Sequence, residues 1–167
     1  MVGGERHANE PTLVRRFQQV QHEAQRDGRR LVVGAVVVNP EGEAFLQRRA
    51  PDVRLFPGAW DIVGGHVEEG EGLLDALDRE IEEETGWRLR SVQRVVTIFD
   101  WEGRDGEAKR EVDVRAVVDG DLARPRLERD RFTACGWFDV GALAELKARC
   151  GDSDEARMIE VALAALS

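Results

Sequence analysis

The stretch GHVEEGEGLLDALDREIEEETGW, residues 65–87, decides the fold and indicates the chemistry. Its skeleton is Gly65, then Glu71 six residues on, then a run of carboxylates that ends at Gly86. This pattern predicts a glycine-bearing loop that leads into a short helix over 72–85. Gly86 is expected to end the helix, because glycine takes the left-handed conformation of a C-cap without strain. We expect the carboxylates to hold a divalent metal against a phosphate.

The helical spacing separates these carboxylates into two groups. Because an α-helix turns about 100° per residue, Glu80, Glu83 and Glu84 form one stripe, and Glu80 and Glu84 border the apolar face. Glu82 falls on the far side, where it is expected to be solvated. Like charges at these spacings repel by about 0.2–0.5 kcal/mol per pair, and by more near a core, so a bound cation relieves them. Oxygen ligands suit Mg²⁺ or Mn²⁺ better than zinc. Arg79, one turn before Glu83, is expected to orient that carboxylate.

A solvated acidic face is the competing explanation, and for a bare Glu-rich helix it is the commoner one. Three further features occur together here: Gly65 and Glu71 precede the helix at fixed spacing, Arg79 adjoins the cluster, and Gly86 follows it. Agreement at every position favours the metal site.

Segment 65–87 resembles the signature box of the Nudix hydrolase family, with every defining position filled. The resemblance implies an α/β protein with the Nudix fold, an α/β/α sandwich around a mixed β-sheet. It also implies Mg²⁺-dependent cleavage of a nucleoside diphosphate linked to another group. By match to the box, the metal positions are Gly65, through its backbone, and Glu80, Glu83 and Glu84. The positions with catalytic or supporting roles are Glu83, Arg79 and Glu71.

Two stretches upstream of the box, residues 47–52 and 56–66, resemble the substrate strand and loop of MutT-like members. The candidate substrate-binding residues of the whole chain are Arg48, Arg49, Phe56, Trp60, His66 and Glu128. A guanidinium group binds two phosphate oxygens at once, and aromatic faces stack on nucleobases. Phe99 and Trp101 are further candidates for stacking. A solvated strand end competes as the explanation for the arginines, and core packing competes for the aromatic residues.

The general base that activates the attacking water has two candidate locations. Glu83 on the helix is the first choice, because it is fixed beside the metal. Glu128 or Asp130, in the charged loop 126–131, is the alternative, although alternating charges are also typical of a solvated loop.

The resemblance favours a MutT-like nucleoside triphosphate pyrophosphohydrolase that releases a monophosphate and pyrophosphate. An isopentenyl-diphosphate isomerase-like enzyme would share the fold, but that family uses a cysteine near the glycine loop, and no cysteine precedes Cys135 here. A non-catalytic nucleotide-binding Nudix domain typically lacks box carboxylates, and none is missing. The chain has no tyrosine, and residues 88–123 have no proline, which disfavours diadenosine polyphosphate and ADP-ribose hydrolases.

Composition fits one domain over residues 1–167, with residues 1–10 flexible and an N-terminal helix over 11–27. The net charge of −9 argues against broad nucleic-acid binding. No apolar run approaches the ~20 residues of a membrane span, and no signal peptide is visible. We therefore expect a cytoplasmic protein with a small-molecule nucleotide substrate and no nucleic-acid or membrane partner. Homodimerisation is common in the family but leaves no clear mark in this sequence.

The remaining pattern predicts alternating strands and helices. Leu31–Val38 is an almost unbroken apolar run and is expected to be a buried central strand. Further expected strands are a return strand over 43–49 and the segments 60–63, 89–101, 111–118 and 132–139. Further expected helices are 140–149 and 154–166.

Overall fold

The computed structural model describes residues 10–167. The expected flexible segment 1–10 therefore lies outside the described residues, except for Glu10, which begins the first helix. The elements are α1 (Glu10–Arg26), β1 (Arg30–Val37), β2 (Ala44–Arg49), β3 (Trp60–Asp61), β4 (Val63–His66), α2 (Leu73–Thr85), β5 (Arg88–Glu102), β6 (Ala108–Asp119), β7 (Phe132–Phe138), α3 (Val140–Cys150) and α4 (Asp154–Leu166).

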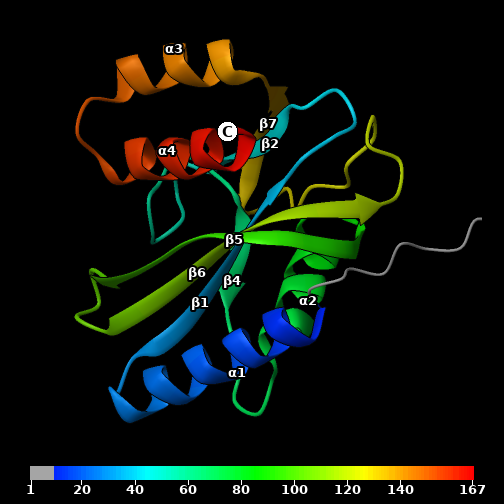
Figure 1. Ribbon diagram of the computed structural model, residues 1–167. Coiled ribbons are helices and arrows are strands. Elements are labelled where there is room, and N and C mark those ends of the chain that lie inside the picture. Colours follow the sequence, from blue (N-terminus) through cyan, green and yellow to red (C-terminus); the bar gives the residue numbers. More distant parts are fainter. Residues whose placement is uncertain (1–9) are drawn as a thin grey trace, which may run out of the picture.

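The expected α/β class with a mixed sheet is confirmed. The larger sheet has the strand order β4-β1-β6-β5, in which β1 runs parallel to β6 and antiparallel to β4. The smaller sheet has the order β3-β2-β7. Helices α1 and α2 lie on one side of the larger sheet, and α3 and α4 lie on the other (Figure 1).

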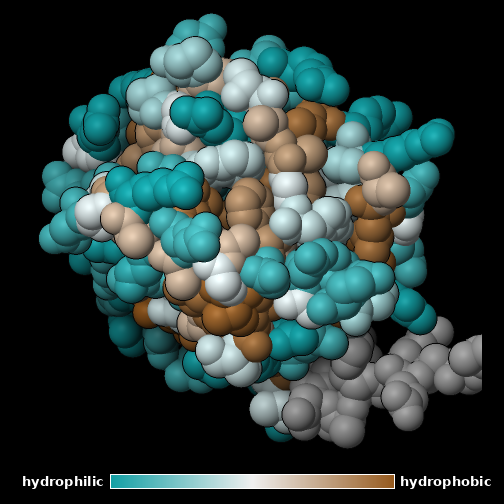
Figure 2. All heavy atoms as spheres, turned by 90° about the horizontal axis from the view of Figure 1, so that it is seen from above, coloured by the Kyte–Doolittle hydropathy of each residue, from teal (hydrophilic) through white to brown (hydrophobic). Residues whose placement is uncertain are grey.

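Successive side chains of β1 point alternately into the two hydrophobic cores of the protein. Val33, Ala35 and Val37 face α1 and α2, where they pack with Phe17 and other apolar side chains. Val36 faces the opposite way, into a second core that α3 and α4 complete. Because β1 is buried on both faces, it carries the continuous apolar run that the sequence shows. Seen from above (Figure 2), the surface is mostly hydrophilic, with separate hydrophobic patches.

Two strands differ from expectation in where they pair. The return strand begins at Ala44 and leaves the larger sheet at once, since it meets the first strand only through the bridge Val38–Ala44. It pairs with β3 and β7 instead. The expected strand 60–63 is divided at Ile62: β3 pairs with β2, and β4 pairs with β1. The chain thus crosses between the sheets at Ile62, which positions the site.

Within residues 10–167, the structure contains no helix with the length and apolar character of a membrane span.

Candidate active site

Helix α2 presents its carboxylates as the helical spacing predicts. It begins after Gly72 and ends at Gly86, whose φ of 77° is left-handed and whose N–H donates to the Glu82 carbonyl. Glu80 and Glu84 are 6% and 1% exposed, whereas Glu82 is exposed. Glu83 is exposed as well. The stripe therefore has two buried members and one accessible member.

Arg79 links the glycine loop to the helix. Its Nε lies 2.8 Å from Glu71 Oε2, and its Nη2 lies 2.9 Å from Glu71 Oε1, so the carboxylate is held at both oxygens. Its Nη1 donates to Glu80 at 2.8 Å and more weakly to Glu83 at 3.4 Å. Its Nη2 also donates to the His66 carbonyl at 3.0 Å. The hydrogen bonds from Arg79 lower the pKa of the Glu71 carboxyl.

Glu84 is held from the side of the sheets. The Gln47 side-chain amide donates to Glu84 Oε2, and the Gly64 N–H approaches the same oxygen at 3.4 Å. Burial raises the pKa of Glu84 well above its ordinary value, and the Glu80 charge adds to this shift. Burial also raises the pKa of Glu80, against the opposing effect of Arg79. A β-carbon on Gly65 would collide with the Glu80 carboxylate, so any larger residue there would displace that side chain.

The donor set fits a hard cation, but the side chains are not gathered around one point. In the part of the chain that the structure describes, no three His, Cys, Asp or Glu side chains form a metal-sized group. The reason is local: Glu80 turns to Arg79, and Glu84 turns to Gln47. Two buried carboxyls beside an exposed third still give an all-oxygen set of the type that Mg²⁺ and Mn²⁺ prefer. Coordination of one cation by all three carboxylates requires other side-chain rotamers, because Arg79 and Gln47 hold Glu80 and Glu84.

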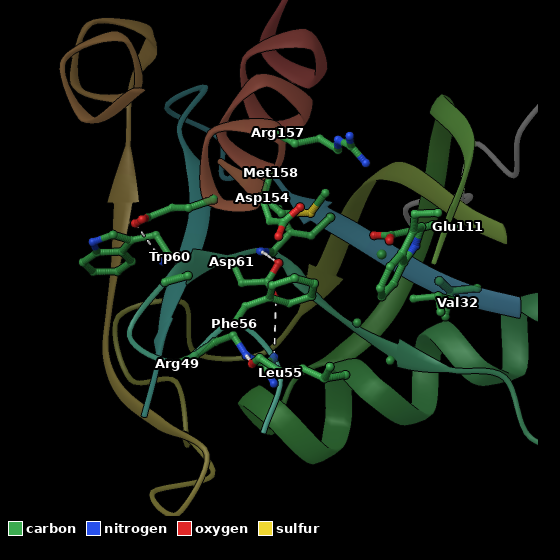
Figure 3. A pocket seen from close by; sticks show the side chains of 18 of the residues that line it. Val32, Arg49, Leu55, Phe56, Trp60, Asp61, Glu111, Asp154, Arg157 and Met158 are labelled. Carbon is green, nitrogen blue, oxygen red and sulfur yellow. Dashed lines mark hydrogen bonds and ion pairs between the residues drawn. The ribbon is translucent and has the colours of Figure 1, made fainter. Parts of the chain in front are cut away.

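A cavity of about 130 Å³ adjoins this helix (Figure 3). A single water needs only about 15 Å³ by a comparable measure, so the cavity admits a larger group. Its lining comes from both sheets, the loop after β2 and helix α4. The lining residues include Arg49, Phe56, Trp60, Asp61, Gly64, Gly65, His66, Phe99, Trp101, Glu111, Arg131, Asp154, Arg157 and Met158.

Most of the expected substrate contacts line this cavity, but Arg48 and Glu128 do not. Arg49 reaches it and pairs with Asp61 at 3.4 Å. Arg48, its neighbour, is exposed, and its Nε donates to the Gly58 carbonyl at 3.0 Å. Glu128 pairs with Arg131 at 3.4 Å. Strand alternation explains the difference between the two arginines, because successive side chains point to opposite faces.

Several lining residues were not expected from the sequence. Asp61 is half-buried, and desolvation raises the pKa of its carboxyl despite the Arg49 charge. Arg131 lies close enough to lower the pKa of both Glu80 and Glu84. Four lining residues come from the start of α4: Asp154, Glu155, Arg157 and Met158.

Two buried carboxyls on β6 were also missed. Burial raises the pKa of Glu111 to about 7, and burial together with Glu111 raises the pKa of Asp113 well above its ordinary value. One signal was available: the run Glu-Val-Asp-Val over 111–114 puts both acids on one face of a strand.

Comparisons with known proteins agree with this geometry. The family model described as NUDIX domain matches residues 28–160. The nucleoside triphosphatase NudI of Enterobacter sp. (strain 638) is 35% identical over 91 residues, which are 54% of this chain and 57% of that protein. The m7GpppN-mRNA hydrolase NUDT17 of Xenopus laevis is 45% identical over 67 residues, which are 39% of this chain and 23% of that protein. The matches thus span less than two thirds of either relative.

Solved structures share the fold. The MutT NUDIX hydrolase from Burkholderia pseudomallei superposes with a TM-score of 0.59 at 27% identity, over 83% of this chain and 98% of that one. A NUDIX hydrolase from Nitrosomonas europaea gives a TM-score of 0.61 at 20% identity, over 80% and 87%.

Proposed function

Because the chain belongs to the Nudix hydrolase family, we propose that it hydrolyses a phosphoric anhydride bond of a nucleoside diphosphate derivative with Mg²⁺ or Mn²⁺. The observation that carries the proposal is the shared boundary of the helix and the cavity. Gly64 and Gly65 line the cavity, and the same two glycines contact Glu84 and Glu80. A nucleotide in the cavity therefore has its phosphates beside the carboxylates of α2.

The substrate proposed in particular is a nucleoside triphosphate, cleaved to a monophosphate and pyrophosphate. Supporting this choice, a relative is named a nucleoside triphosphatase, and the stretches 47–52 and 56–66 resemble the substrate segments of MutT-like proteins. An isomerase-like reaction would need a cysteine near the glycine loop, and Cys135 and Cys150 lie on β7 and at the end of α3.

The proposed mechanism divides the work between helix and cavity. Glu80, Glu83 and Glu84 would hold the cation, together with the Gly65 backbone. When bound, the cation supplies positive charge to the phosphate and lowers the pKa of a water. Glu83, as the exposed member, takes the proton from the attacking water. Arg79 keeps Glu80 in place through the contact at 2.8 Å.

The cavity residues bind the remaining parts of the substrate. Arg49 and Arg131 offer guanidinium groups to the phosphate oxygens. Phe56 and Trp101, with ring centroids 5.8 Å apart, offer aromatic faces to the base.

The test is a hydrolysis screen with nucleoside triphosphates, nucleoside diphosphate sugars, dinucleotides and isopentenyl diphosphate. Each is incubated with Mg²⁺, with Mn²⁺ and with EDTA. The expected result is metal-dependent release of pyrophosphate from a triphosphate. The matched variants are Glu84→Gln, expected to lose most activity, and Glu82→Gln, expected to keep it. Nucleotide binding without turnover would leave a non-catalytic binding domain as the function, and equal turnover in EDTA would refute the metal requirement.

A further inference from the structure

A row of four side chains crosses the larger sheet under the cavity. Strand register sets His66 beside Val32, Val32 beside Glu111, and Glu111 beside Phe99. All four line the cavity. Glu111 is 7% exposed, and Figure 3 shows its carboxyl turned toward the cavity. An ionisable group is thus built into the floor of the cavity, between Val32 and Phe99.

Asp113 lies behind Glu111 in the next row. It is fully buried, and neither of its oxygens has a hydrogen-bond donor among the described residues. The facing position on β1 is Gly34, where a β-carbon would collide with the Asp113 carboxyl and with Ile62. The glycine therefore makes room for the acid.

The two acids share their protons. Burial raises the pKa of both carboxyls, and the Glu111 charge raises that of Asp113 further. Two like charges this close do not both ionise near neutral pH, so the pair retains a proton, and a proton on Asp113 leaves Glu111 ionised. The group that faces the cavity is then a carboxylate, which accepts hydrogen bonds and donates none.

The nearby cationic side chains do not form ion pairs with the Glu111 carboxylate. Arg157 lies over the Phe99 ring at 5.2 Å, and Lys109 lies over the Trp101 ring at 4.8 Å. Neither forms an ion pair with Glu111 in the described part of the chain; Lys109 pairs with Asp105 at 3.6 Å. A carboxylate can accept several hydrogen bonds, so a ligand in the cavity can donate to Glu111 in addition to its neighbours Asp113 and Trp101.

We propose that Glu111, with Asp113 beside it, recognises the nucleobase, and that the cavity binds bases with an exocyclic amino group in preference to bases without one. The proposal rests on the proposed function for its premise that the ligand is a nucleotide. Cytosine, adenine and guanine each present amino N–H donors, and carboxylates accept from such groups. Uracil and thymine instead flank a single N–H with two carbonyl oxygens, which repel a carboxylate.

Two pairs of mononucleotides isolate the amino group. CMP and UMP differ at the 4-position, and GMP and IMP differ only in the 2-amino group. Their dissociation constants are measured in EDTA by titration calorimetry, so no turnover is needed. The test is therefore independent of the hydrolysis screen: the function can fail there while base selection holds here, and the reverse.

In at least one pair, the amino-bearing member is expected to bind about tenfold more tightly or better. Glu111→Gln should reduce that ratio to about threefold or less, because the amide replaces one acceptor by a donor. Asp119→Asn, an exposed acid on the same strand, should leave the ratio unchanged. Glu111→Ala provides a second variant if Glu111→Gln does not fold, and it too should reduce the ratio. Equal binding within both pairs, or a preference that persists in the folded Glu111 variant, would overturn the proposal.

Discussion

The Arg79 guanidinium donates hydrogen bonds to both oxygens of the Glu71 carboxylate, at 2.8 and 2.9 Å, and so links the glycine loop to helix α2. A lysine cannot reproduce this two-point contact. Arg79→Lys is expected to lower the free energy of unfolding by about 1–3 kcal/mol and to reduce turnover, because Glu80 loses its orienting donor. The measurements are urea denaturation and the rate of pyrophosphate release.

The matched control for Arg79 is Arg88, which holds Asp78 in a similar two-point contact at 3.1 and 2.6 Å. Arg88 is far more exposed, with 60% of its side chain accessible against 24% for Arg79. Arg88→Lys should therefore barely change the free energy of unfolding and should leave turnover intact. Equal losses of stability and turnover in Arg79→Lys and Arg88→Lys would show that Arg79 has no special role.

Added Mg²⁺ should raise the melting temperature. A ligand that binds only the folded state stabilises it by about 1.4 kcal/mol at ten times its dissociation constant, which amounts to a few degrees for a chain of this size. The shift should vanish when Glu80 and Glu84 are both changed to Gln. An equal shift in that variant would place the cation elsewhere.

Gly65→Ala should impair catalysis more than folding. The added β-carbon displaces the Glu80 carboxylate, while the backbone at this position needs no left-handed conformation. Turnover is expected to fall at least about tenfold, with a melting temperature within a few degrees of the parent. Gly141→Ala is the control, because its β-carbon would meet only an ordinary contact in α3. Full activity in Gly65→Ala would show that the position of Glu80 is not critical.

Glu83→Gln distinguishes the two candidate bases. If Glu83 takes the proton, kcat should fall about 10²-fold or more while KM changes little, since a group that acts in the transition state affects turnover rather than binding. Glu128→Gln and Asp130→Asn should be mild. A collapse of kcat in either loop variant, with turnover retained in Glu83→Gln, would reverse the assignment.

The stability of the protein should fall between pH 4.5 and about 7 because of Glu111. Its pKa rises from 4.5 in the unfolded chain to about 7 in the fold, mainly through burial, with Asp113, Asp61, Trp101 and Arg157 as the neighbours that adjust it. Over that interval the folded state binds more protons than the unfolded state, so the free energy of unfolding decreases as pH rises. Glu111→Gln should flatten this decline by about 1–3 kcal/mol in urea denaturation.

Helix α2 was predictable because each of its positions has a local cause. Spacing along one helix decides which carboxylates are buried, and a left-handed cap requires Gly86. The cavity depends instead on contacts between distant segments. The chain crosses between the sheets at Ile62 because β3 pairs with β2 whereas β4 pairs with β1. No local sequence pattern predicts these pairings. Strand alternation sends the side chains of Arg48 and Arg49 to opposite faces, but only the packing of the two sheets determines which of them reaches the cavity. The cytoplasmic location, the single domain and homodimerisation stay predictions.

The carboxylates of α2 and the wall that α4 contributes to the cavity belong to segments some seventy residues apart. Changes at Arg157 or Met158 therefore alter the shape of the cavity without touching the carboxylates of α2. The part of the site that would bind the substrate can thus vary in sequence independently of the part that would hold the metal.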